Sequence, residues 1–380
     1  MTKTLSLLVA PLALLPALAA CGDNPRSTAD AMSVSPSRAV VVAGDFADGS
    51  PGVLSTLDPV SFAVAQAVGP AMAVGSDPVL RRLGAELFVI NRASGNNVTI
   101  LDEQTFALKE QLGTGPGSNP QDAAANGDKV YVATLAGTGL SVLTRGSTAV
   151  TAITLPDDDP DHEPNCNSVF LVGPALYVSC GLLDENFQPR GPGKVYVVDT
   201  ATNTVRPALT LTLSTPNPIS LFEEVPLAAP HGGELLLPTA TFDPTTFEVT
   251  GGCVERIVPS TIPSAPGCLV TNTDLGGYAS RASIQSSAGT AITFFAVPTV
   301  FPSSELRAYD MPTAAFWAGA LNAPTETIGD VAVCPTGEIV VADTTTNLNG
   351  LRVYNGATEV TAAVLPIGKP PKSTHGLVCY

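Results

Sequence analysis

An all-β fold built from seven repeated units is predicted for this chain of 380 residues. Three observations predict it: a composition rich in turn-forming residues, a pair of strand patterns that recurs along the chain, and a C-terminal segment that resembles an internal strand. Glycine and proline number 34 each, whereas charged residues make up only 14% of the sequence. This composition is typical of short strands joined by turns and not of amphipathic helices.

The repeated unit is clearest after residue 86. An apolar strand at residues 87–91 is followed by a turn rich in glycine and asparagine and then by an alternating strand at residues 97–102. Alternation of apolar and polar residues between turns is the signature of β-strands. Copies of the apolar strand are predicted at residues 39–43, 87–91, 130–134, 176–180, 234–238, 292–297 and 339–343. Their partner strands are predicted at residues 52–58, 97–102, 139–143, 194–199, 254–258, 305–310 and 350–354.

The copies follow one another at intervals of roughly 43 to 60 residues, which indicates four-stranded blades stacked in a ring. A ring must close, and the first unit begins directly with its second strand at residue 39. The missing inner strand is supplied by residues 373–380, which resemble the inner strand of the seventh unit at residues 329–334. The sequence therefore predicts a seven-bladed β-propeller whose C-terminal strand closes blade one, the alternative being an unrelated pair of β-sandwiches.

Three segments carry a resemblance to a known repeat. They are Phe-Val-Ile-Asn at residues 88–91, Tyr-Val-Ala-Thr at residues 131–134 and Tyr-Val-Val-Asp at residues 196–199. The pattern resembles the YVTN family of β-propeller repeats, and the resemblance is strongest in units two to four. It implies the propeller fold and no particular activity.

The first twenty residues are predicted to be an export signal and not part of the fold. Lys3 supplies the one charge, residues 5–15 form an apolar run, and small residues lead to Leu-Ala-Ala-Cys at residues 18–21. This order is that of a secretory signal, and the run is too short to span a bilayer, which takes about 20 residues. The alternative is an ordinary signal peptide that contains a chance cysteine.

The segment that ends at Cys21 resembles the lipobox of bacterial lipoproteins. The resemblance implies a diacylglyceryl group on the Cys21 thiol, cleavage before Cys21, and acylation of the new amine by a chain such as palmitate. It divides the chain into a lipoprotein signal peptide at residues 1–20, a lipidated tether at residues 21–37 and a β-propeller domain at residues 38–380. Because Gly22 and not an acidic residue follows Cys21, we expect a lipid-anchored protein of the bacterial cell envelope, at the outer membrane and either periplasmic or surface-exposed.

The charge balance limits the partners. The whole chain has a formal net charge of −16, and cleavage of the signal removes Lys3 and makes the balance more negative by one unit. An acidic protein is repelled by nucleic acid and by anionic lipid surfaces, so we expect no nucleic-acid partner. We expect a monomer that contacts the membrane through its lipid anchor and binds an envelope or extracellular protein or glycan.

Six cysteines follow Cys21, and an even number in an exported chain indicates disulfides. None of them has the close spacing of a zinc site. We expect three bonds, each between strand ends that the repeat places near one another: Cys166 with Cys180, Cys253 with Cys268, and Cys334 with Cys379. The last bond joins the inner strands of blades seven and one and so latches the ring.

An acidic run at residues 157–163 lies in a loop that leads into an inner strand, at one mouth of the expected channel. It contains Asp158, Asp161 and His162. Carboxylates bind hard cations such as calcium, which makes these residues candidate metal ligands. The run lacks the spacing of a calcium loop, however, and a solvated acidic loop is the other interpretation.

Three further residues are candidate ligands at the same mouth. Asp77 and Asn119 each precede a proline at the start of an inner strand, and His375 precedes the last strand. The alternative for Asp77 and Asn119 is an Asx turn that fixes the loop before the proline. Two long loops, at residues 180–193 and 239–252, are expected on the same face.

Two functions are compatible with these patterns. The favoured one is a non-catalytic, membrane-anchored binding or scaffold protein without a cofactor, because no Ser-His-Asp order and no Gly-x-Ser-x-Gly segment is recognisable. The alternative is a metal-dependent exported hydrolase or lactonase-like propeller enzyme, with calcium or another cation held by carboxylates at the channel mouth. The metal content of the purified protein distinguishes these two functions.

Overall fold

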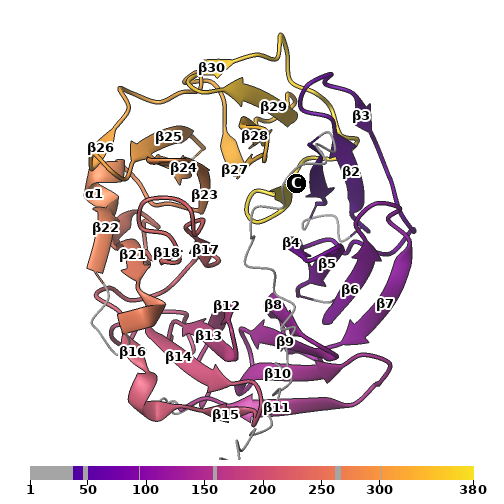
Figure 1. Cartoon of the computed structure of the whole chain (residues 1–380), viewed down its shortest axis with the longest axis vertical. Helices are drawn as coiled ribbons and strands as arrows, with labels where there is room; N and C mark the ends of the chain where they lie inside the picture. Colours follow the sequence, from indigo (N-terminus) through magenta and orange to yellow (C-terminus); the bar gives the residue numbers. More distant parts are fainter. Residues whose placement is uncertain (1–36, 46–49, 94, 157–160, 262–266, 301) are drawn as a thin grey trace, which may run out of the picture.

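The computed structural model describes residues 37–45, 50–93, 95–156, 161–261, 267–300 and 302–380. Seven antiparallel sheets stand around a central channel, so the chain forms a ring when viewed along its shortest axis (Figure 1). Six of these sheets have four strands and one has five. The predicted seven-bladed β-propeller is therefore confirmed.

Blades one to four come from the ends and the first half of the chain. Their strands, given from the channel outward, are as follows. Blade one has β31 (Leu377–Cys379), β1 (Ala39–Ala43), β2 (Val53–Leu57) and β3 (Val64–Ala65). Blade two has β4 (Pro78–Leu83), β5 (Glu86–Asn91), β6 (Asn97–Asp102) and β7 (Leu108–Gly113). Blade three has β8 (Pro120–Asn126), β9 (Lys129–Thr134), β10 (Gly139–Thr144) and β11 (Val150–Thr154). Blade four has β12 (Cys166–Val172), β13 (Ala175–Cys180), β14 (Lys194–Asp199) and, both paired with β14, β15 (Thr204–Val205) and β16 (Leu211–Thr212).

Blades five to seven complete the ring, and blade five carries an insertion. Blade five has β17 (Glu223–Glu224), β18 (Leu235–Pro238), β21 (Cys253–Ile257) and β22 (Gly267–Thr271), with a separate ribbon of β19 (Thr241–Phe242) and β20 (Val249–Gly251). Blade six has β23 (Arg281–Ser287), β24 (Thr290–Pro298), β25 (Ser304–Asp310) and β26 (Ala315–Phe316). Blade seven has β27 (Ile328–Val333), β28 (Glu338–Asp343), β29 (Gly350–Asn355) and β30 (Thr358–Glu359). The helices are η1 (Pro207–Leu209), η2 (Pro259–Thr261) and α1 (Asn272–Leu275).

The second and third strands of the blades lie where the repeat predicts them. Strands β1, β6 and β14 have the predicted bounds, and most of the others differ by one or two residues at an end. Copies five and six, whose sequences match the repeat less well, are blades like the rest. In blade five the inner strand has only two residues and the β19–β20 ribbon is inserted after the second strand.

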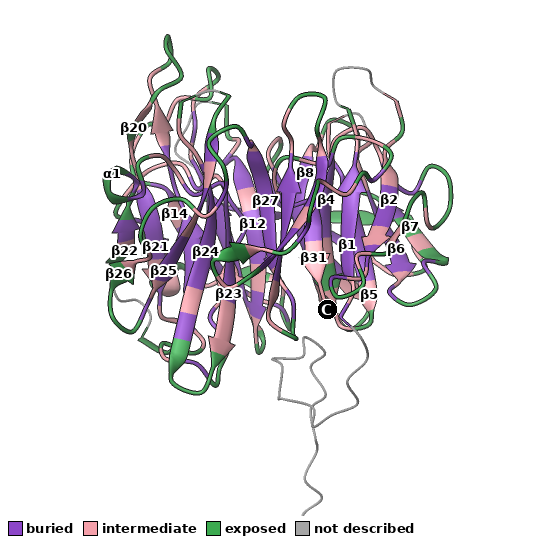
Figure 2. Cartoon of the chain, turned by 90° about the horizontal axis from the view of Figure 1, so that it is seen from above, coloured by how far each residue is buried: buried purple, intermediate pink, exposed green. Residues whose placement is uncertain are grey.

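The core lies between the blades and not within them. All five residues of β1 are buried, since its two faces are covered by blades seven and two. The buried strands consequently read as continuous apolar runs. Figure 2 shows this buried layer through the middle of the molecule, with exposed loops at both faces.

The C-terminal strand closes the ring as predicted. Strand β31 pairs with β1, and beyond it Arg38 and Tyr380 exchange two backbone hydrogen bonds, of 2.7 and 3.0 Å. The Cys334–Cys379 bond joins blade seven to this strand, with the Cα atoms 4.8 Å apart. The Cys166–Cys180 and Cys253–Cys268 bonds are present as well. All three predicted disulfides are therefore confirmed.

The two faces of the ring differ. We call the face where the chain runs into the inner strands the upper face and the opposite one the lower face, as they lie in Figure 2. Strand β20 projects above the upper face, and the C-terminus lies at the lower face. Because Arg38 pairs with Tyr380, the described chain begins at the lower face too. No helix of the described residues is long and apolar enough to cross a membrane.

Candidate functional site

Charged and polar side chains of three inner strands meet in the wall of the central channel. Arg81 of β4 binds both carboxylate oxygens of Asp122 of β8, with Nε–Oδ1 and Nη2–Oδ2 distances of 2.7 and 2.8 Å. Ser168 of β12 donates its hydroxyl to Asp122 Oδ2 at 2.7 Å, and the Val169 backbone N–H donates at 2.9 Å. Asp122 is fully buried. Its carboxylate therefore connects blades two, three and four.

Blade seven repeats this arrangement with a second buried aspartate. Asp330 of β27 accepts the backbone N–H groups of Gly376 and Leu377 at 2.7 and 3.0 Å, and both belong to the segment that closes blade one. Its nearest cation, the Arg281 guanidinium, is 3.5 Å away. Burial raises the pKa of Asp330 to about 6, although Arg281 and the N–H groups act in the opposite direction. The carboxyl group therefore keeps its proton to a higher pH than a solvated aspartate does.

Arg281 stands between two acidic side chains and a histidine. Its Nη1 atom is 3.6 Å from Glu223 Oε2 and 3.5 Å from His375 Nδ1. Burial raises the pKa of Glu223. Burial, and after it the charge of Arg281, lowers the pKa of His375 well below its ordinary value. The His375 imidazole is consequently neutral at neutral pH.

A buried serine contacts this histidine, and the pair resembles part of a hydrolase triad. Ser220 Oγ lies 3.2 Å from His375 Nε2, but it also donates to the Ser280 carbonyl at 3.1 Å. Its single proton is thus used, so His375 donates from Nε2 and accepts from Arg281 at Nδ1. A triad needs the opposite: a histidine that accepts the serine proton and an acid that stabilises the imidazolium. The Ser220–His375 pair is therefore arranged for structure and not for acyl transfer.

The channel opens at the lower face into a cavity of about 250 Å³. Arg81, Arg82, Phe222 and Glu223 contribute to its lining. Both arginines have acidic partners, since Arg82 Nε lies 2.6 Å from Glu103. These pairings neutralise the cationic groups that an anionic ligand would need.

The upper face carries a larger hollow, of about 530 Å³, between the β19–β20 ribbon, α1 and the loop after β24. Two apolar side chains stand at it with little cover: Phe247 is 78% exposed and Val300 is 80% exposed. The other lining groups include the side chains of Thr250, Asn272 and Thr273. The carboxylate of Glu248 lies in the lining too, and none of the lining residues is a cation. A hollow with hydroxyl, amide, apolar and acidic groups is suited to an apolar ligand surface without negative charge.

The exposure of Phe247 is unusual for its place in a turn. In three turns an aspartate accepts two backbone N–H groups and is followed, four residues on, by a phenylalanine with positive φ: Asp58 with Phe62, Asp102 with Phe106, and Asp243 with Phe247. Phe106 is only 8% exposed and Phe62 is half-buried. Only Phe247, on the projecting ribbon, has no blade beside it to pack against.

The candidates Asp77 and Asn119 are held by bonds within the upper face. Asp77 forms ion pairs with Arg92, at 2.7 Å, and with Lys372. These two cations, against the effect of burial, lower the pKa of Asp77. Asn119 accepts the Ala93 backbone N–H at 3.0 Å, from the loop of blade two. These contacts join neighbouring loops, and a ligand role for either residue stays a prediction.

The acidic loop is described only in part, because Asp158 lies outside the described residues. Asp161 accepts the backbone N–H of Glu163 at 2.9 Å, and His162 is exposed with a positive φ. The structure does not place His375 beside them: it is 4% exposed and lies in the channel wall. Calcium binding by this loop stays a prediction.

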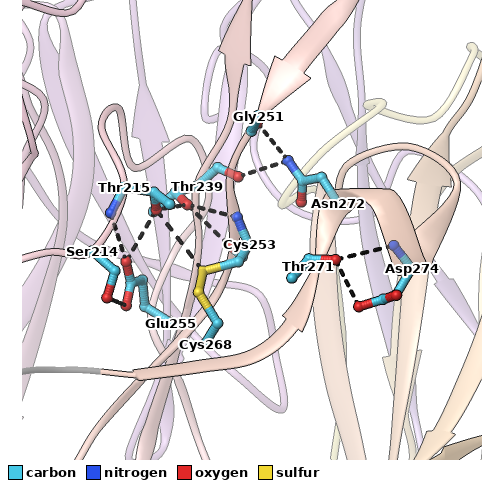
Figure 3. The surroundings of a disulfide bond; sticks show 10 residues. All are labelled: Ser214, Thr215, Thr239, Gly251, Cys253, Glu255, Cys268, Thr271, Asn272 and Asp274. Carbon is cyan, nitrogen blue, oxygen red and sulfur yellow. Dashed lines mark hydrogen bonds between the residues drawn. A yellow bond between two sulfur atoms is a disulfide. The ribbon is translucent and has the colours of Figure 1, made fainter.

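One group of potential metal ligands lies close together among the described residues: Cys253, Glu255 and Cys268, whose ligand atoms are within 4.8 Å of one another. Figure 3 shows that the two sulfur atoms are bonded to each other. Because the thiolate is the metal ligand, this group does not fit a metal while the disulfide is intact.

The charged residues of the channel wall were not predicted from the sequence. Asp122 and Asp330 lie third in strands whose other residues are mostly apolar. A charged residue at the same place in two copies of a buried strand is a signal that aligning the inner strands would have exposed. Their partners Arg81 and Arg281 carry no such signal, because the blade that each arginine contacts is set only when the ring closes.

Several solved structures share the fold but little sequence. A putative 6-phosphogluconolactonase from Bacteroides uniformis is 12% identical, with 91% of this chain and 100% of that chain covered and a TM-score of 0.60. A quinonprotein alcohol dehydrogenase-like protein from Bacteroides thetaiotaomicron is 11% identical, covering 89% and 77%, with a TM-score of 0.55. Apo AztD from Citrobacter koseri is 14% identical, covering 90% and 98%, with a TM-score of 0.52. No family model and no curated protein matches the chain. These likenesses define the class, a β-propeller, and not an activity.

Proposed function

We propose that this chain is an exported, membrane-anchored β-propeller that binds a partner without catalysis, through its upper face. The observation that carries the proposal is the uncovered Phe247 beside the hollow of the β19–β20 ribbon. An aromatic side chain that projects into solvent next to a concave surface is the kind of anchor on which protein interfaces depend. The buried Ser220–His375 pair, with its proton already used, supports the non-catalytic reading.

The anchor and the binding face are on opposite sides of the ring. Ser37 begins the described chain at the lower face, where its hydroxyl lies 2.5 Å from that of Thr336. A lipid on Cys21 is joined to Ser37 by the fifteen residues 22–36, so that the two ends are at most about 55 Å apart. The chain therefore leaves the ring toward the proposed anchor at the lower face, and the hollow lies at the face opposite this attachment point. This arrangement leaves the hollow open to a partner.

The partner that best fits the hollow is an envelope or extracellular protein with an apolar contact patch. Phe247 and Val300 supply apolar area, and the threonines and Asn272 supply hydrogen-bonding groups around it. The acidic net charge of −16 disfavours nucleic acid and anionic lipid as occupants.

Site-specific photocrosslinking in intact cells tests the binding face. We expect a photoreactive amino acid at position 247 to capture a defined protein that mass spectrometry identifies. The matched control places the same group at Ala288, which is exposed in the turn between β23 and β24 at the lower face. Equal capture from both positions, or capture from position 288 alone, contradicts the proposal.

Metabolic labelling tests the anchor separately. We expect a labelled fatty acid to be incorporated into the wild-type chain and not into Cys21→Ser. Label that persists in C21S shows that the lipid is not on this cysteine. The result of the labelling experiment does not depend on that of the crosslinking experiment. The first tests the anchor alone, and the second tests the binding face alone.

A further inference from the structure

Blade five contains a disulfide whose two sulfur atoms have different surroundings. Cys253 begins β21 and is fully buried, whereas Cys268 lies on the edge strand β22 and is exposed. The bond between Cys166 and Cys180 differs, because both of its cysteines are fully buried. An external thiolate can therefore approach the blade-five bond in line from one side only, at Cys268.

A buried carboxylate lies next to this bond. Glu255 follows Cys253 by two residues on β21, so its side chain is on the same side of the strand. It is fully buried, and its carboxylate lies within 4.8 Å of both sulfur atoms. No cation forms an ion pair with Glu255 among the described residues. Burial raises the pKa of Glu255, so this side chain keeps a proton at a higher pH than a solvated glutamate.

One hydroxyl contacts both the carboxylate and the buried sulfur. Thr215 Oγ1 lies 3.0 Å from Glu255 Oε1 and 3.9 Å from Cys253 Sγ (Figure 3). The Thr215 backbone N–H and the Ser214 hydroxyl also donate to Glu255, at 3.0 and 3.2 Å. These contacts hold the carboxyl group beside the bond.

We propose that Cys253–Cys268 is an exchange-active disulfide that reacts with an external dithiol at Cys268, with Glu255 as the proton donor to Cys253. The attacking thiolate forms a bond to Cys268 Sγ, the disulfide breaks, and the electron pair leaves on Cys253 Sγ. The Glu255 carboxyl protonates that thiolate, and the negative charge moves from Cys253 Sγ to the Glu255 carboxylate. The Thr215 N–H and the Thr215 and Ser214 hydroxyls stabilise that carboxylate until it takes a proton from solvent. The second thiol of the dithiol then displaces Cys268, so the dithiol is oxidised and the cysteine pair is reduced by two electrons.

Native-state reduction of the wild-type protein gives the first test, with dithiothreitol as the dithiol. The reaction is quenched by alkylation, and the fraction reduced is measured for each pair by mass spectrometry. The Cys166–Cys180 bond is the internal control, because it closes 14 residues against 15 for Cys253–Cys268. We expect Cys253–Cys268 to be reduced at least about tenfold faster. Equal rates, or faster reduction of the control bond, overturn the proposal.

Exposure alone also predicts faster reduction, so the part of Glu255 needs a variant. We expect Glu255→Gln to lower the ratio of the two reduction rates about tenfold or more, because the amide cannot donate a proton from a carboxyl group. The ratio is measured within one molecule, which cancels any general loosening of the fold. Glu248→Gln, at an exposed position of the same blade, should keep the wild-type ratio.

A second variant keeps the test decisive if E255Q does not fold. Thr215→Val removes the hydroxyl between Glu255 and Cys253 and leaves the carboxyl group in place. We expect the same direction of change with a smaller size. A wild-type ratio in E255Q shows that Glu255 takes no part. If only T215V folds, a wild-type ratio there shows that the hydroxyl joining Glu255 to Cys253 has no effect on the reaction, and either result overturns the assignment.

Discussion

Two buried aspartates, Asp122 and Asp330, connect neighbouring blades through one side chain each. A carboxylate offers about four acceptor positions, so it can take donors from its own strand and from the next blade at once. Asp122 serves Arg81 and blade four, and Asp330 serves the segment that closes blade one. Other polar contacts also join neighbouring blades, such as the ion pair of Arg145 with Glu86, but these two carboxylates are fully buried on inner strands and fix how those strands are aligned.

Replacing Asp122 by Asn should destabilise the fold strongly. The variant removes the charge that neutralises the buried Arg81, and breaking one partner of such a pair typically costs about 3–5 kcal/mol. The free energy of unfolding is measured by denaturant titration. Asp128→Asn is the control: it is exposed on the turn before β9 and should change stability by less than about 0.5 kcal/mol. A change in D122N no larger than in D128N contradicts the role given to Asp122.

Asp330 predicts a dependence of stability on pH with a definite sign. Its folded-state pKa of about 6 lies above its ordinary value of 3.8, so the folded state holds this proton more tightly than the unfolded one. The contribution of Asp330 to the free energy of unfolding is therefore fully present below pH 3.8 and is lost as the pH rises through 6. The shift corresponds to about 3 kcal/mol.

The measurement compares unfolding free energies of the wild type and of Asp330→Asn between pH 4 and pH 7. The difference between the two proteins should change with pH in the direction stated, because the amide does not titrate. A constant difference over this range shows that Asp330 is ionised throughout it. Titration of other carboxyl groups affects both proteins alike and cancels in the difference.

At the level of elements, the same kind of turn places one phenylalanine in the core and another in solvent. Phe106 in its turn on blade two is packed and 8% exposed, whereas Phe247 in the same kind of turn on the ribbon is 78% exposed. We expect Phe106→Ala to lower the free energy of unfolding by about 3–5 kcal/mol. Phe247→Ala should change the free energy of unfolding by less than about 0.5 kcal/mol. The partner identified by crosslinking from position 247 should nevertheless no longer copurify with the F247A protein. Loss of stability in F247A, or partner recovery at the wild-type level, contradicts its assignment as a contact residue.

The elements that the sequence predicts best are those whose signal is local. The period-two alternation and the Gly/Asn turns of β5 and β6 determine their bounds to within a residue, and the cysteines follow from where the strand ends meet. The pairing of Arg81 with Asp122 and of Arg281 with Asp330 was not predictable, because each pair joins different blades. The ribbon was expected only as a long loop at residues 239–252, since its strands are two and three residues long.

At the scale of the whole molecule, the position of the chain ends determines which face is free. Ser37 and Tyr380 both lie at the lower face, where the ring is closed by strand pairing. In the proposed lipid-anchored protein, the attachment point is on the face opposite the projecting ribbon. The paired chain ends and the projecting ribbon thus lie at opposite faces of the propeller.

The Cys334–Cys379 bond should therefore govern how readily the ring opens. It spans 45 residues, and a cross-link of that length stabilises by about 4 kcal/mol in the chain-entropy model. In Cys334→Ala/Cys379→Ala we expect a loss of that order and faster hydrogen exchange at the Val378 and Tyr380 amides. The control, Cys166→Ala/Cys180→Ala, removes a bond within one blade and should leave exchange in β31 slow. If exchange in β31 is as slow without the latch as with it, the backbone pairing to β1 and the Asp330 carboxylate hold the strand by themselves.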